Sequence, residues 1–283
     1  MKVSPSREAA RLGEAWRLAL RPPPTGGASG GLKGRGAGAS TEFLDHRHYR
    51  PGDDVRKLDW RAYARTDQLL LKQFQEEVRP TLELLVDCSA SMATDPAKAA
   101  MAMDLTSVLA QGCSGDGWLV RAWLLGDDVE RPPLDGVLSQ GVTVTGRRPL
   151  QELVTEIQGR MRPGAVVLVL SDFLSPHQAP ALVRGLSRRA GVLGLVQVLS
   201  DWDAAPPQGG SMQFEDAESG QSVEVVLDGA TVRRYMDRLG RLQDGLSQET
   251  RRVGGRFVVV RSGLGLDRAC RQLAEEGILG VAN

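Results

Sequence analysis

The sequence predicts an α/β protein built on a doubly wound, mostly parallel sheet. Continuous apolar runs, which are typical of strands covered on both faces, occur at 84–86 and 165–170, and a further strand is expected at 192–199. Segments with helical spacing lie between these runs. Strands that alternate with helices favour a parallel sheet, and right-handed crossovers place the helices on both of its faces.

The composition excludes several classes of protein. Lys and Arg together number 35, as do Asp and Glu, so the formal net charge is zero and the basic footprint of a nucleic-acid-binding protein is absent. The three cysteines are far apart, which supports neither a zinc knuckle nor a disulfide framework. No stretch approaches the ~18–20 apolar residues that span a bilayer. We therefore expect no membrane span and a cytoplasmic location.

The first part of the chain predicts a separate N-terminal region. Apolar residues at helical spacing predict a helix over 5–20, which prolines 22–24 end. Residues 25–39 are rich in glycine and indicate a flexible or ligand-wrapped loop. We expect 1–79 to form this helix, the loop and an irregular extension that packs on a main domain, 80–283.

The extension contains a segment, 40–65, without helical or strand periodicity. Its residues are of kinds that pair with one another, such as Arg with Asp, and a long irregular segment needs side-chain hydrogen bonds for its backbone. It is either a charged brace against the sheet or a surface that recognises a partner. Its candidate residues are Arg47, Tyr49, Asp53, Asp54, Arg56, Asp59, Trp60 and Arg65.

The main domain divides into expected elements in order. Alternating or continuous apolar residues predict strands at 69–77, 82–86, 117–125 (with a short partner near Val129), 165–170, 192–199 and 257–260. Helical spacing, with Asp95 as the cap of the first helix, predicts helices at 96–111, 150–161, 176–190, 230–253 and 267–276. Residues 136–149 are expected to be loop, and 211–227 an inserted hairpin.

Polar side chains follow two of the buried strands. Asp87, Ser89 and Ser91 come directly after 82–86, and Asp172 comes after 165–170. Because the carboxyl ends of central parallel strands meet at one crevice, we expect these oxygens to lie together. They suit Mg²⁺ or Mn²⁺, with water completing the coordination. The plain alternative is a strand end followed by an ordinary helix-capping serine.

The same residues carry a resemblance. Asp87-x-Ser89-x-Ser91 with Ser171-Asp172 resembles the von Willebrand factor A-like fold and its metal-ion-dependent adhesion site, in which an acidic residue of the partner often completes the coordination. That site also takes a threonine, for which Thr145 is the nearest candidate here. By spacing, the position falls on Arg148, whose guanidinium would then replace the cation or neutralise the site.

The chain is similar, more narrowly, to the domain-of-unknown-function family fifty-eight. The residues that carry this similarity are Glu42-Phe43, Arg47-x-Tyr49-Arg50-Pro51-Gly52-Asp53-Asp54-Val55-Arg56, Leu58-Asp59-Trp60, Ala64-Arg65, Asp87-Cys88-Ser89-Ala90-Ser91-Met92 and Leu170-Ser171-Asp172-Phe173. The resemblance implies a non-enzymatic protein-binding and assembly module that acts with a MoxR-type AAA+ ATPase, or on that ATPase's client, in the maturation of protein complexes. The alternative is a metal-dependent hydrolase that uses Asp87 and Asp172 with a metal-activated water.

Overall fold

The computed structural model describes residues 1–22, 33–34, 43–74, 76–77, 79–217 and 220–282. Contacts divide the chain into two compact units. The larger unit comprises Met1–Pro22 and Pro80–Asn283, and the smaller comprises Pro23–Arg79. The N-terminal helix thus lies in the unit that holds the main sheet. The segment 40–65, called the signature segment from here on, lies in the other unit. The expectation that the extension packs on the main domain stays a prediction.

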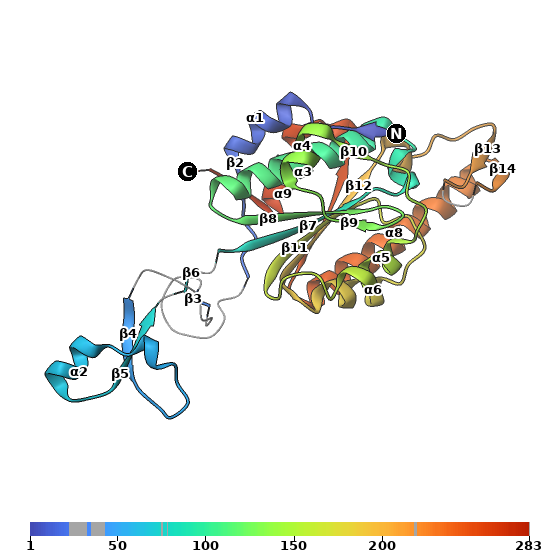
Figure 1. Cartoon of the computed structure of the whole chain (residues 1–283). Helices are drawn as coiled ribbons and strands as arrows, with labels where there is room; N and C mark the ends of the chain where they lie inside the picture. The colour runs from blue at the N-terminus through green and yellow to red at the C-terminus, as the bar shows by residue number, and fades with distance from the viewer. Residues whose placement is uncertain (23–32, 35–42, 75, 78, 218–219, 283) are drawn as a thin grey trace. The chain divides into compact units, whose positions relative to one another are not determined.

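The larger unit is built on a six-stranded sheet with the order β15-β12-β11-β7-β8-β9 (Figure 1). All neighbours pair in parallel except β9, which runs antiparallel to β8. A mixed α/β architecture around a mostly parallel sheet is therefore confirmed. The strands are β7 (Thr81–Asp87), β8 (Leu119–Leu125), β9 (Val129–Glu130), β11 (Ala165–Ser171), β12 (Ala190–Leu199) and β15 (Arg256–Arg261).

Helices cover both faces of this sheet (Figure 1). One face carries α1 (Arg7–Ala15), α3 (Pro96–Gly115), α4 (Leu134–Gln140) and α9 (Leu266–Glu275). The opposite face carries α5 (Leu150–Ile157), α6 (Ala179–Ser187) and α8 (Gly229–Arg252). Asp95 caps α3 by accepting a hydrogen bond from the backbone N–H of Ala97, as expected.

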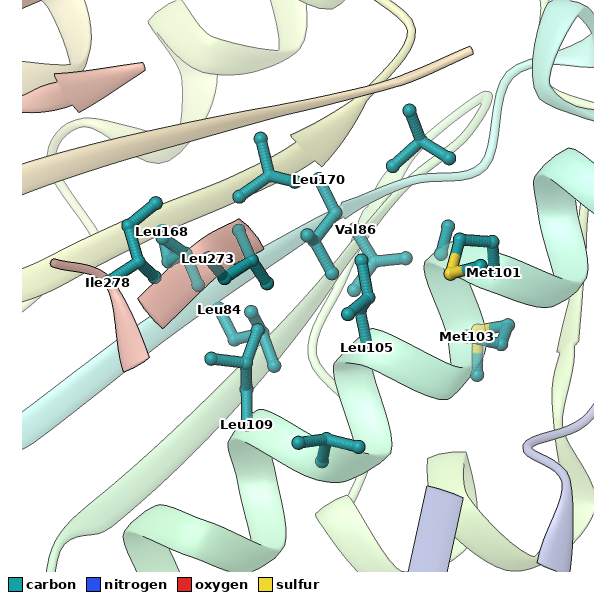
Figure 2. Close-up of a cluster of buried hydrophobic side chains, with 14 of the residues drawn as sticks. Leu84, Val86, Met101, Met103, Leu105, Leu109, Leu168, Leu170, Leu273 and Ile278 are labelled. Carbon is teal, nitrogen blue, oxygen red and sulfur yellow. The ribbon is translucent and has the colours of Figure 1, made fainter. Parts of the chain in front are cut away.

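Side chains of the central strands alternate between two apolar cores. Leu84 and Leu168 pack against α3 and α9 in the cluster that Figure 2 shows, whereas their neighbours Leu85 and Val169 belong to the cluster beneath α5, α6 and α8. Because both faces are buried, no position of these strands needs a polar residue for solvent. This is the physical reason why these strands are mostly apolar. The exceptions away from the strand ends, Glu83 of β7 and Gln197 of β12, are buried and hydrogen-bonded.

Several sequence-based expectations were wrong. The first helix ends at Ala15, and the next residues form β2 (Trp16–Leu18), which pairs with β16 (Leu279–Val281). Trp16 and Leu18 are buried on alternate positions, so a strand accommodates them as well as a helical stripe does. The expected loop at 136–149 contains most of α4 and the short strand β10 (Val142–Thr143), which pairs with β1 (Lys2–Val3).

The smaller unit contains regular structure where none was expected. The segment 40–65 includes β4 (Phe43–His48), the 3₁₀ turn η1 (Val55–Lys57) and α2 (Trp60–Thr66). The strand expected at 69–77 is confirmed as β5 (Leu70–Phe74), which pairs with β4. The glycine-rich stretch lies outside the described residues except for β3 (Lys33–Gly34), which pairs with β6 (Glu76–Glu77).

The inserted hairpin is confirmed as β13 (Ser211–Glu215) and β14 (Ser222–Val226), although part of its turn lies outside the described residues. It follows the one-turn helix α7 (Asp201–Ala204) and precedes α8. Across the described part of the chain, every helix is too short or too polar to cross a membrane.

A buried carboxylate, Glu83, ties β7 to β8. It accepts hydrogen bonds from Arg121 Nη1 (2.6 Å), Trp123 Nε1 (2.6 Å) and the backbone N–H of Arg162 (2.7 Å). We expect Glu83→Gln to lower the free energy of unfolding by roughly 2 kcal/mol, because one charge-assisted acceptor becomes a donor. Urea denaturation measures this loss, with the exposed Glu152→Gln as the matched control. Equal stability of the two variants would contradict the role assigned to Glu83.

Candidate functional site at the carboxyl edge of the sheet

The carboxylates expected to meet at the sheet edge do meet there. Asp87 ends β7, Ser171 ends the adjacent parallel strand β11, and Asp172 follows it. Ser171 Oγ donates a hydrogen bond to Asp87 Oδ2, and the charge of Asp172 acts on Asp87. Asp87 is 4% exposed and Asp172 is 1% exposed. Two buried acidic groups thus lie side by side at the carboxyl edge of the sheet, which is called the rim from here on.

The loop after β7 brings two hydroxyls to the same place. The backbone N–H of Ser89 donates to Asp87 Oδ1 (2.8 Å), which folds the loop back over the carboxylate. Ser89 Oγ lies 2.9 Å from Ser91 Oγ, and Ser91 is the partly exposed member of the group. Ser89 precedes the 3₁₀ turn η2 (Ala90–Ala93) but makes no side-chain capping bond, so the capping alternative does not account for its hydroxyl.

Asp87 is poorly suited to carry its charge in this environment. Burial and, to a lesser degree, the charge of Asp172 raise the Asp87 pKa to about 6, against an ordinary value of 3.8. Hydrogen bonds from Ser171 and Ser89 oppose this rise without cancelling it. At neutral pH the group is ionised at a cost, and a cation at the rim would remove that cost.

The rim also holds a cation that sequence reasoning missed. Lys98, in the first turn of α3, is 1% exposed, and its Nζ donates to Asp172 Oδ2 (2.9 Å) and Asp203 Oδ2 (3.1 Å). Burial alone would lower the Lys98 pKa, but the charges and hydrogen bonds of both aspartates outweigh burial and raise it. The available signal was a lysine between alanines on a helix that is otherwise buried.

Thr145, the candidate for the threonine position, donates its backbone N–H to the Cys88 carbonyl (3.0 Å) next to Asp87, and its role as a metal ligand stays a prediction. Thr145 lines a neighbouring groove together with Cys88 and Gly126. Arg148 directs its guanidinium to surface carboxylates, with Nη1 3.3 Å from Glu156 Oε2. The cation found next to a carboxylate of this group is Lys98, which pairs with Asp172. The main chain of this loop still braces the site, because the Ala90 N–H donates to the Gly146 carbonyl.

The residues of the rim fit a cation that keeps much of its water. Two carboxylates (Asp172 and Asp203) share the ammonium of Lys98, so this group retains negative charge, and the charge of Asp172 acts on Asp87. Mg²⁺ is commonly held by one or two carboxylates plus water, and Asp87, Ser89 and Ser91 meet that requirement. No cluster of three or more His, Cys, Asp or Glu side chains suited to a metal occurs among the described residues, so water or a partner would complete the coordination.

In the smaller unit, the signature arginine and aspartates bind within their own segment. Arg47 donates from Nη1 and Nη2 to the two Asp53 oxygens (2.8 and 2.6 Å), and Asp53 also accepts from the Arg50 N–H. The bond from Arg47 lowers the Asp53 pKa. Asp54 accepts from the Arg56 N–H and caps η1. These contacts hold the loop together internally, and the choice between a brace against the main sheet and a surface that recognises a partner stays a prediction.

Asp59 performs a similar task at α2. It accepts hydrogen bonds from the N–H groups of Arg61 and Ala62, and its other oxygen lies 2.9 Å from His46 Nε2. Trp60, by contrast, is 61% exposed and packs edge-to-face on Tyr63. Two further signature residues make main-chain bonds: the Tyr49 N–H donates to the Leu69 carbonyl, and Arg65 Nε donates to the Arg61 carbonyl.

Comparison with known sequences identifies the family. Residues 45–245 match the family described as "Protein of unknown function DUF58". The chain belongs to the DUF58 family. The uncharacterized protein Rv1480 of Mycobacterium tuberculosis is 28% identical over 209 residues, which are 68% of this chain and 66% of that protein. The chain thus spans just under two thirds of this relative. The uncharacterized protein YeaD of Bacillus subtilis is 39% identical over 66 residues, 23% of this chain and 17% of YeaD.

Among solved structures, this DUF58 chain is similar to BatB, a conserved hypothetical protein from Bacteroides thetaiotaomicron. The likeness has a TM-score of 0.41 at 12% sequence identity, and it covers 70% of this chain and 98% of BatB.

Proposed function

We propose that this DUF58 protein is a non-enzymatic protein-binding and assembly module with a von Willebrand factor A-like sheet and an adhesion-type cation site at its rim. Its partner would be a MoxR-type AAA+ ATPase, or that ATPase's client, in the maturation of protein complexes. The observation that carries the proposal is the meeting of Asp87, Ser89 and Ser91 with Asp172 at one edge.

The site has the properties of a docking point. A bound Mg²⁺ would be held by Asp87, Ser89 and Ser91, and it would offer an open position to an acidic side chain of the partner. Ser91 is the partly exposed end of the set, which gives such a side chain access. Asp172 forms an ion pair with Lys98, and the charge of Asp172 acts on the ligand Asp87.

The hydrolase alternative fits the rim less well. A metal-activated water next to two carboxylates needs both of them for the metal or for proton transfer. Asp172 Oδ2 already accepts a hydrogen bond from the buried ammonium of Lys98 (2.9 Å), so this oxygen is engaged outside a metal-activated water site.

The test measures capture of the MoxR-type ATPase from the same organism by the full chain, in Mg²⁺ and in EDTA. We expect Mg²⁺ to tighten binding by about tenfold, since one charged contact desolvated at an interface is worth roughly that factor. Asp87→Ala should abolish the gain from Mg²⁺, because it removes the charged ligand. The exposed Asp244→Ala is the matched control and should keep it.

Calorimetry with Mg²⁺ alone separates the site from the partner. Heat of Mg²⁺ binding that is present in the wild type and lost in Asp87→Ala would support the cation site even if the ATPase is the wrong partner. Equal Mg²⁺ dependence of capture in wild type and Asp87→Ala would refute the proposed docking mechanism.

A further inference from the structure

A second candidate site lies beside the hairpin, away from the ligands of the rim. Helix α7, the hairpin β13–β14 and the first half of α8 enclose a cavity of about 440 Å³. Figure 1 shows the hairpin projecting from the sheet next to the start of α8. Cavities of this size are large enough to take one or two amino-acid side chains or a small ligand.

The lining of this cavity is apolar and aromatic. Trp202 of α7 packs against Phe214 of the hairpin (5.5 Å between ring centroids) and Tyr235 of α8 (6.5 Å), and Val225 and Leu227 add aliphatic surface. Tyr235 uses its hydroxyl elsewhere, because it donates to the Asp203 carbonyl (2.8 Å). The part of the cavity lined by Trp202, Phe214 and Tyr235 is therefore suited to an apolar side chain.

The apolar surface continues out of the cavity along the hairpin. Phe214 pairs with Val223, and Met212 pairs with Val225, so these four side chains share one face of the two strands. Met212 is 40% exposed and Val223 is 58% exposed. The strip extends past the cavity, because Met212 and Val223 are not among the residues that line it, and this favours an extended chain over a compact small molecule as the occupant.

The charge at the mouth of the cavity is positive. Arg234 and Arg238 of α8 line it. Within the described residues Arg238 makes no ion pair, whereas Arg234 donates to the Thr231 hydroxyl (3.3 Å) and its charge acts on Asp228. The hairpin's acidic residues Glu215 and Glu224 lie on its opposite face, because side chains alternate along a strand. An apolar floor with two arginines at the mouth complements an apolar anchor flanked by carboxylates.

From this geometry we infer that the pocket binds a peptide segment of the partner protein in which a large apolar side chain is flanked by acidic residues. The apolar anchor fills the space beside Trp202, and the carboxylates pair with Arg234 and Arg238. The inference rests on the proposed protein-binding function and names the chemistry of the partner's docking segment. Asp203 joins the two sites, since it binds both Tyr235 and Lys98.

Fluorescence anisotropy with labelled synthetic peptides tests this inference. The probe is a short peptide with Leu and Phe between Asp and Glu residues; a second peptide replaces the acids by Lys, and a third replaces Leu and Phe by Ser. All measurements use the full chain in EDTA, so the cation site plays no part. We expect only the acidic, apolar peptide to bind, and added salt to weaken its binding.

Two variants address the two halves of the pocket. Arg234→Glu with Arg238→Glu should weaken peptide binding by at least about tenfold, because attraction becomes repulsion. Arg188→Glu with Arg251→Glu reverses the same charge at exposed positions outside the pocket and should bind as the wild type does. Thr231→Phe, which fills the cavity, should also lose binding while the helical circular dichroism stays unchanged.

Three results would overturn the inference: equal binding of the acidic and basic peptides, equal binding by the two double variants, or binding of vesicles with anionic lipid in place of the acidic peptide. Because peptide binding is measured without Mg²⁺, its failure leaves the magnesium-dependent capture of the ATPase standing. Failure of that capture likewise leaves the peptide result standing.

Discussion

Lys98→Met is expected to lower the free energy of unfolding by about 3–5 kcal/mol, which is the usual cost of removing one partner from a buried ion pair. The methionine keeps the volume of the lysine stem but leaves Asp172 and Asp203 without their cation. Both carboxylates lie against Lys98 Nζ, at 2.9 and 3.1 Å, and Asp172 is 1% exposed. Urea denaturation at neutral pH measures the loss.

A second substitution separates the charge effect from packing. Lys98→Met combined with Asp172→Asn should recover a large part of the lost stability, because the unpaired negative charge is then removed as well. Stability of Lys98→Met within about 1 kcal/mol of the wild type would show that water reaches the rim and screens the pair.

The stability that Lys98 contributes depends on pH. The pKa of Lys98 is raised above 10.5, so its contribution to the free energy of unfolding is present below that pH and is lost as the pH rises through the higher folded value.

Asp87→Asn is expected to stabilise the metal-free protein above pH 6. The folded pKa of Asp87 is raised to about 6 from 3.8, so the native state favours the protonated form. This contribution is fully present below 3.8 and is lost as the pH rises through about 6. The difference between the two values corresponds to about 3 kcal/mol, which sets the upper bound of the gain.

Denaturation curves in EDTA across this pH range provide the measurement. The wild type should lose stability relative to Asp87→Asn between about pH 4 and pH 6, and the two curves should then run parallel. The exposed Asp244→Asn should follow the wild type at every pH. A wild type that gains stability over Asp87→Asn in this range would contradict the assignment, because it would mean that the Asp87 pKa is lowered in the folded protein. Saturating Mg²⁺ should stabilise the wild type more than Asp87→Asn, since the cation binds the folded carboxylate.

Much of the fold could be predicted because the strongest local signals coincide with the tertiary arrangement. The strands β7, β11 and β12 are mostly apolar because helices cover both faces, and their hydrophobic residues therefore located them directly. The short elements β2, β10 and β16 were missed. Each has only two or three residues, and its stability comes from a partner strand far away in the sequence, as when Leu18 pairs with Leu279.

The sequence by itself determined which carboxylates reach the rim, because Asp87 and Asp172 each follow a buried strand whose direction the α/β pattern dictates. Only the tertiary structure decided what faces them. Lys98 lies on a helix and Asp203 lies beyond β12, and no local pattern relates either residue to Asp172. Charge compensation inside a protein acts through space over a few ångströms, so its partners are chosen by packing and not by position along the chain.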